Sequence, residues 1–260
     1  MHRKRMLSAT SLALILVAGI SSAQDVVVSE NIVGFVRENT EPGVQIVGVP
    51  FVNGTNTLAE IVGTNGVAGN DISNADVVYA YTPEATSYKE FWLADDSYGA
   101  EFQRKWIDHD QSIVATNEFT SEAALWYKSR AATSNELVFV GEVVADGAVT
   151  NTIVPGVQLV SYPFSCDQSL NEMSLTNGLA GEDISTADTI YLYVPGEGGY
   201  KSFWLADDSY GAEFQLKWID RDKAEVATNV VGMGQGFWYR SRGASAFDWV
   251  EERPYDLQAE

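Results

Sequence analysis

The side chains best suited to chemistry in this sequence are carboxylates in two acidic segments, one in each half of the chain. Each segment has two adjacent Asp residues, then a Glu, then an Asp-x-Asp pair. Calcium takes about six to eight oxygen ligands from carboxylates and carbonyls on a turning backbone. The candidate metal ligands are Asp95, Asp96, Glu101, Asp108, Asp110, Asp207, Asp208, Glu213, Asp220 and Asp222.

The spacing of these carboxylates departs from that of an EF-hand loop, because no Asp-x-Asp-x-Asp-Gly run is present. The chain has 36 Asp and Glu against 16 Lys and Arg, a formal net charge of -20. In so acidic a protein, solvation of the surface alone explains an acidic loop. We favour a solvated loop, with calcium as the alternative, and the sequence indicates no other cofactor.

Large aromatic residues give a second set of candidates, and most of them occur twice. Neighbouring residues of a strand face opposite sides, so one ring of Phe91-Trp92 and one of Trp126-Tyr127 must point away from the core. An outward ring flanked by carboxylates offers a stacking surface and hydrogen-bond acceptors, as a neutral sugar or a protein partner requires. The alternative is that a loop or the neighbouring module covers the ring. The candidate ligand-binding residues are Trp92, Tyr98, Trp126, Trp204, Tyr210 and Trp238.

Catalytic signatures are weak. The chain has two His; His2 lies in the leader, and Arg221 stands where the second half should repeat His109, which we expect in a surface turn. The sequence contains no Gly-x-Ser-x-Gly, HExxH or phosphate-binding glycine loop. Abundant carboxylates leave a paired-carboxylate glycan hydrolase open, but the sequence favours a non-enzymatic protein.

An internal repeat organises these residues. Pro42–Val47 recurs as Pro155–Val160, and the thirteen-letter run FWLADDSYGAEFQ at Phe91–Gln103 recurs unchanged at Phe203–Gln215. Recent duplication or a local constraint would each explain that identity. We infer two tandem modules, residues 24–145 and 146–260.

Short runs rich in Val, Ile, Tyr, Phe and Trp, separated by Gly, Asn, Asp and Ser, predict an all-β fold in which each module is a small sandwich or barrel. We expect strands at Val44–Phe51, Ala75–Tyr81, Ser87–Leu93, Ile113–Thr116, Leu125–Lys128 and Leu137–Val144. A helix of one or two turns is expected at Thr57–Val62 and again at Ser169–Leu175. Asp146-Gly147 is typical of a tight hairpin turn between the modules.

The modules resemble the repeated units of exported bacterial proteins that begin with a Pro-Gly strand, continue with a Trp strand and end in Gly-x-Gly-Tyr/Phe-Trp/Phe. Here these motifs are Pro42–Val47 and its repeat, and Gly234-Gln235-Gly236-Phe237-Trp238. The resemblance implies an exported β-module without an assigned chemistry. Copy one departs from it at Glu122-Ala123-Ala124, so the turn that Gly234 allows must be made differently there.

The first 23 residues resemble a secretory signal peptide, with a basic start, an apolar stretch and Ser-Ser-Ala before the expected cleavage. The mature chain would then be periplasmic, extracellular or at the cell surface. Its acidity argues against nucleic acid as a partner, and no later segment suggests membrane insertion. Cys166, the single Cys, is expected to be buried.

These observations predict an exported, non-enzymatic binding or surface-interaction protein with carbohydrate or cell-surface protein partners. A self-associating envelope or matrix protein is the first alternative, and a carboxylate-dependent glycan hydrolase is the second. The sequence does not fix the oligomeric state.

Overall fold

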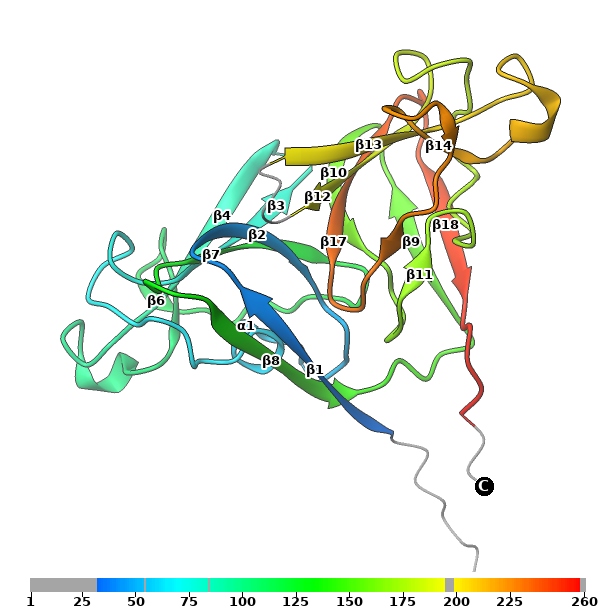
Figure 1. Ribbon diagram of the computed structural model, residues 1–260. Coiled ribbons are helices and arrows are strands. Elements are labelled where there is room, and N and C mark those ends of the chain that lie inside the picture. Colours follow the sequence, from blue (N-terminus) through cyan, green and yellow to red (C-terminus); the bar gives the residue numbers. More distant parts are fainter. Residues whose placement is uncertain (1–31, 54, 84, 195–198, 258–260) are drawn as a thin grey trace, which may run out of the picture. The chain divides into compact units, whose positions relative to one another are not determined.

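The computed structural model describes residues 32–257 except for 54, 84 and 195–198. The predicted signal peptide therefore lies outside the described residues. The fold is all-β with two similar halves, residues 33–142 and 148–252, which confirms the predicted tandem β-modules (Figure 1). Within the described residues, no helix is long and apolar enough to cross a membrane.

Copy one consists of an antiparallel sheet and a two-stranded ribbon. The sheet has the order β2-β7-β3-β4-β5-β6, with β2 at Gly43–Gly48, β7 at Ala124–Ser129, β3 at Val77–Thr82, β4 at Ser87–Leu93, β5 at Trp106–Asp108 and β6 at Ile113–Val114. The ribbon pairs β1 (Val33–Thr40) with β8 (Asn135–Glu142). The six predicted strands are present, β4 with the predicted bounds and the others with shifted ends, whereas β1 and β5 were not predicted.

Copy two repeats this plan. Its sheet has the order β10-β17-β12-β13-β14-β15, with β10 at Gly156–Ser161, β17 at Gly236–Ser241, β12 at Thr189–Val194, β13 at Gly199–Leu205, β14 at Trp218–Asp220 and β15 at Glu225–Val226. The ribbon pairs β9 (Ala148–Ile153) with β18 (Phe247–Glu252), and a short pair joins β11 (Gln168–Ser169) to β16 (Val230–Val231). Short 3-10 turns follow β4 and β13, at Ala100–Phe102 and Ala212–Phe214.

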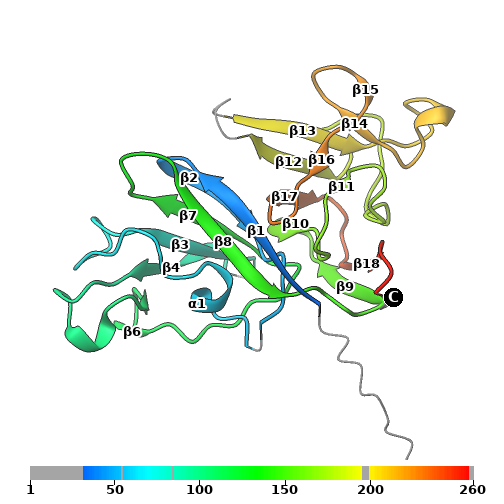
Figure 2. The same ribbon diagram turned by 60° about the horizontal axis from the view of Figure 1, so that its bottom comes forward.

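Each module buries its core between the sheet and the ribbon, as in a two-layer sandwich. In copy one the inward residues of the sheet, such as Phe91 and Tyr127, pack with Leu137 and Phe139 of the ribbon. The ribbon strand β8 alternates between buried and exposed residues, because successive side chains of a strand face opposite sides. Figure 2 shows the copy-one helix α1 (Leu58–Ile61) beside β8.

The predicted helix is present in copy one only, so its prediction for copy two was wrong. In copy one, Thr57 and Glu60 form a capping box at the start of α1. At the position of Ala59, a strong helix former, copy two has Asn171. The amide of Asn171 bonds the backbone of Trp218 and Ala227 instead. This competition, together with the β11–β16 pairing, leaves the segment as a turn.

The predicted hairpin at Asp146-Gly147 is also wrong. The strands on either side, β8 and β9, do not pair with each other but with β1 and β18. Residues 143–147 therefore form an irregular connection, and the predicted module boundary falls inside it. Cys166 is half-buried, not fully buried, and its side chain packs against the copy-two core. Burial raises the pKa of its thiol.

The two modules pack through an approximate two-fold relation that the repeat makes visible. The Gly48 amide donates to the Gly234 carbonyl at 2.6 Å, and the equivalent Ser161 amide donates to the Glu122 carbonyl at 2.9 Å. Such reciprocal contacts define an isologous interface, in which each partner uses the same patch. Here both partners belong to one chain.

Residues beside the two-fold axis face their own counterparts in the other copy. A Cβ atom added to Gly236 would lie 2.4 Å from Cβ of Ala124, its counterpart. A Cβ atom added to Gly48 would lie 2.7 Å from Cβ of Ser161, likewise its counterpart. In each pair only one member can carry a side chain, so the junction requires two copies that differ at these positions.

Candidate functional site

The tryptophans of the repeated FWLADDSYGAEFQ segment are buried under the loop that follows them. Trp92 is 4% exposed and Trp204 6% exposed. The ring of Tyr98 packs edge-on against Trp92 at 4.8 Å between centroids, and Tyr210 packs on Trp204 at 5.4 Å. Trp92 and Phe91 do face opposite sides of β4, but the loop covers the outward ring. These contacts indicate a structural role for the predicted ligand-binding residues Trp92 and Trp204 and for the tyrosines that cover them, Tyr98 and Tyr210.

The acidic loop carboxylates mostly organise their own backbone. Asp95 and Asp207 each accept a hydrogen bond from the amide two residues later, at 2.9 Å, a common turn geometry for Asp. Among the described residues, no three His, Cys, Asp or Glu side chains gather so that they could hold a metal ion. The expected calcium ligands Asp96, Glu101, Asp110, Asp208, Glu213 and Asp222 are therefore not brought together into a metal site.

Asp108 and Asp220, also expected as metal ligands, are buried structural groups. Asp108 is 2% exposed and accepts hydrogen bonds from the Asp110 and Gln111 amides. Its other oxygen lies 2.8 Å from the Lys89 ammonium. Burial raises the pKa of Asp108, but these donors and the Lys89 charge outweigh burial and hold the pKa below its ordinary value. Its oxygens are thus already engaged.

Sequence reasoning missed a buried carboxylate in each module. Asp188 is fully buried and accepts hydrogen bonds from the Tyr239 hydroxyl at 2.7 Å, the Leu179 amide at 3.0 Å and the Arg242 amide at 2.6 Å. In copy one, Asp76 accepts the three equivalent hydrogen bonds, one of them from the Tyr127 hydroxyl. These three donors satisfy the oxygens of a carboxylate that lies away from solvent. The only signal in the sequence was the recurrence of each Asp and Tyr in both copies.

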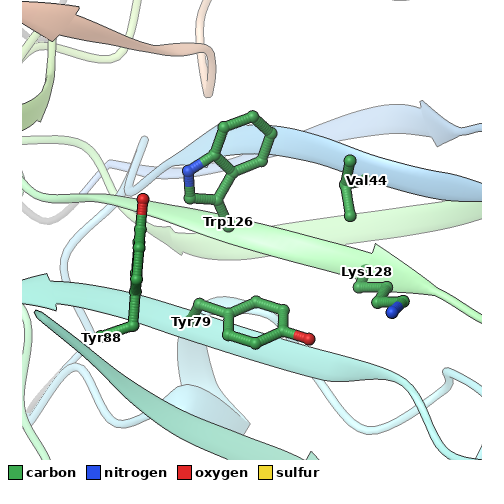
Figure 3. Close-up of a pocket in the computed structure, with 5 residues that line it drawn as sticks. All are labelled: Val44, Tyr79, Tyr88, Trp126 and Lys128. Atoms are coloured by element: carbon green, nitrogen blue, oxygen red, sulfur yellow. The ribbon is translucent and has the colours of Figure 1, made fainter.

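An open hollow on the outer face of the copy-one sheet is a candidate ligand site. It has a volume of about 260 Å³ and is lined by Val44, Tyr79, Tyr88, Trp126 and Lys128, which come from β2, β3, β4 and β7 (Figure 3). Tyr127 points into the core while Trp126 points outward, as the strand alternation predicts. Figure 3 shows the hydroxyl of Tyr88 directed toward the indole nitrogen of Trp126.

The same side chains recur on the copy-two sheet. The counterparts of the five lining residues are Val157, Tyr191, Tyr200, Trp238 and Arg240. Tyr88 and Tyr200 are each 43% exposed, and Val44 and Val157 are 45% and 40% exposed. Each face therefore presents aromatic rings, an aliphatic residue and a cationic donor to solvent. We call these two sets the aromatic faces.

Three tyrosines of the aromatic faces, Tyr79, Tyr88 and Tyr200, have raised pKa values. Partial burial raises the pKa of Tyr79, and the nearby Glu90 carboxylate raises it further. Burial likewise raises the pKa of Tyr88 and Tyr200. A hydrogen bond with an indole, that of Trp126 for Tyr88 and that of Trp238 for Tyr200, lowers each pKa by a smaller amount. Neutral phenols can both donate and accept hydrogen bonds. Together with the rings, they suit a ligand that has apolar faces edged by hydroxyl groups.

A smaller polar cleft lies at the junction of the modules, lined by Glu38, Asn39, Gln45, Tyr193, Gly234 and Gln235 among others. Burial raises the pKa of Glu38, and the charge of Asp167 raises it further. A glycan hydrolase needs two carboxyl groups, one on each side of the bond that it cleaves. Asp167, however, accepts a hydrogen bond from the Met233 amide at 2.8 Å, which gives it a role in holding this turn.

His109 lies exposed in the turn after β5, as expected, within range of a charge interaction with the Asp71 carboxylate. Comparison with known proteins finds no matching family model, and neither the curated proteins nor the solved structures yield a match. The aromatic faces are therefore the features of this chain that bear on its function.

Proposed function

We propose that this chain is an exported, non-enzymatic binding protein that holds carbohydrate against its aromatic faces. The observation that carries the proposal is the recurrence of Tyr79, Tyr88 and Trp126 in copy two, with matched exposure of the tyrosines. Solvent-facing aromatic rings are costly to leave uncovered and are typical of binding surfaces. Export follows from the leader sequence and places the protein where glycans are abundant.

A glycan array and a pull-down with insoluble polysaccharides test the proposal on the mature chain. We expect binding that persists in EDTA, because the acidic loops do not form a metal site. Tyr88→Ala and Tyr200→Ala should each weaken binding by about tenfold or more, the usual cost of truncating an aromatic anchor. Phe35→Ala is the matched control, because Phe35 is 65% exposed on the ribbon, outside the aromatic faces.

Three results would speak against the proposal. Binding to no glycan would remove it, and binding lost equally in Phe35→Ala would place the site elsewhere. Release of reducing ends from a bound glycan, abolished by Glu38→Gln, would favour the hydrolase and the junction cleft.

Self-association is the second candidate, and a separate surface favours it. On the outer side of the copy-one ribbon, Phe35 and its cross-strand partner Val140 are 65% and 49% exposed. Their copy-two counterparts are Ala148 and Glu252. The apolar stripe is thus confined to copy one, and uncovered apolar strands promote association. Light scattering across protein concentrations should show oligomers that Phe35→Ser dissociates; a monomer at all concentrations would rule this function out.

A further inference from the structure

We infer that the two aromatic faces form one continuous binding surface, which takes a single extended polysaccharide chain across the module junction. This inference rests on the proposed carbohydrate function and specifies its ligand. The alternative is a pair of separate sites, each holding a short glycan. The contacts between rings, the rigidity of the junction and the symmetry of the surface all favour the single site.

Aromatic contacts cross the junction at two equivalent places. The ring of Tyr81 in copy one packs edge-on against Trp238 in copy two, with 5.0 Å between centroids. Trp126 in copy one packs on Tyr193 in copy two at 5.7 Å. Each tryptophan of an aromatic face is therefore held in place by a ring of the other copy. Neither face is complete within its own module.

The rings continue outward from these crossing contacts on both sides. Tyr88 packs against Tyr81 at 5.3 Å and Tyr79 at 6.2 Å, and Tyr200 packs against Tyr193 at 5.4 Å. Burial raises the pKa of Tyr200, and Tyr88 of the other copy raises it further. Two short ligands on faces that share their rings would compete for the same space.

The junction holds the two halves of this surface in a fixed orientation. Around the two-fold axis, Ile46, Ala124 and Leu159 form a small core against which Tyr81, Trp126, Tyr193 and Trp238 pack. Below it, the Ser161 hydroxyl bonds the carbonyls of Ser121 and Ala123, each at 2.9 Å. Binding of a ligand that contacts both halves therefore costs no conformational entropy for ordering the modules. Once the ligand is bound to one half, its contact with the other half forms at a high effective concentration.

The symmetry of the surface indicates a repeating polymer. The two-fold relation presents the same side chains twice, ending in Lys128 on one side and Arg240 on the other. A chain of identical sugar units offers similar apolar faces and hydroxyls at intervals along its length. Such a ligand can contact both halves at once, in opposite chain directions, because stacking on a ring does not depend on the direction of the chain; a single sugar can contact only one half.

Titration calorimetry of the mature chain tests the inference, with cello-, chito- and malto-oligosaccharides of increasing length as probes. We expect one ligand per chain at saturation. In the series that binds, affinity should rise by about 10²- to 10⁴-fold once the oligosaccharide is long enough to reach both halves. Tyr88→Ala and Tyr200→Ala should each lower the affinity for the long oligosaccharide by about tenfold or more, and the stoichiometry should remain one ligand per chain. Val250→Ala, at a residue that is 43% exposed on the copy-two ribbon and outside the aromatic faces, should leave affinity and stoichiometry unchanged.

A junction variant tests the same inference without touching a ring. Gly236→Ala introduces a methyl group that meets Ala124 and displaces the two halves. It should remove the gain with length while short oligosaccharides bind as before, and adding Ala124→Gly should restore the gain. Two ligands per chain, with Tyr88→Ala removing one and sparing the other, would overturn the single surface and leave the carbohydrate function standing. Binding of none of the probes would leave both without support.

Discussion

The pairing of Gly236 with Ala124 makes a specific prediction about how the two modules hold together. Gly236→Ala places a Cβ atom 2.4 Å from Cβ of Ala124 and 2.6 Å from Cγ2 of Ile46. Both distances are far inside van der Waals contact, and Ala124 and Ile46 belong to the buried junction. The substitution should therefore strain the interface rather than fill a space.

The expected cost combines two opposing effects. Overpacking of a well-packed interior costs about 1–3 kcal/mol. Replacing Gly by Ala restricts the unfolded chain and returns about 0.4–1 kcal/mol, and the backbone at Gly236 needs no positive φ. The net loss in the free energy of unfolding should lie between about 0 and 2.6 kcal/mol, with a central value of about 1.3 kcal/mol. Ala124→Gly alone should cost about 0.5–1 kcal/mol, because glycine weakens a strand.

The double variant Ala124→Gly/Gly236→Ala exchanges the two side chains across the two-fold axis and serves as the rescue. Urea denaturation followed by tryptophan fluorescence should place it within about 1 kcal/mol of the parent, so that the two changes are strongly non-additive. The remaining contact with Ile46 prevents complete recovery. Additive losses in the double variant would refute the two-fold junction.

Three further predictions concern buried groups. Tyr239→Phe removes a donor from the buried Asp188 carboxylate and should cost about 1.5–3 kcal/mol by urea denaturation, whereas Tyr79→Phe on the open face should cost less than about 0.5 kcal/mol. Burial raises the pKa of Glu251 above its ordinary 4.5, so its contribution to stability is present below that pH and is lost as pH rises through the higher folded-state pKa. The Glu251→Gln variant should therefore have a higher melting temperature than the parent at pH 7.5 and the same melting temperature at pH 4. Trp204→Ala should cost about 3–5 kcal/mol, because its ring fills a small core under the loop.

Each of these three has an outcome that would contradict it. Equal losses in the two Tyr→Phe variants would mean that the hydroxyl of Tyr239 contributes nothing to stability. If the variant and the parent differ in melting temperature by the same amount at both pH values, Glu251 does not contribute to the pH dependence of stability. If Trp204→Ala leaves stability unchanged and abolishes carbohydrate binding, Trp204 is a ligand-binding residue and not a structural one.

The sequence by itself determined the repeat, most of the strands and the alternation of side chains along each strand. Alternation depends on local periodicity, so the opposite orientations of Trp126 and Tyr127 follow from their adjacent positions, whereas the structure shows which of the two points outward. The turn at Gly234 also follows from sequence, since its φ of 81° favours glycine. The leader and the location of the mature protein stay predictions.

Tertiary structure alone decided what covers each outward face. Periodicity places Trp92 and Trp126 on the same face of the sheet, but a loop folds over Trp92 while Trp126 meets a ring of the other copy. The partnership of Asp188 with Tyr239 joins residues 51 positions apart. Such contacts depend on how the chain closes in space, and their energies come from burial and from paired polar groups that no local pattern encodes. For the same reason, the aromatic faces emerge only when both copies are packed together.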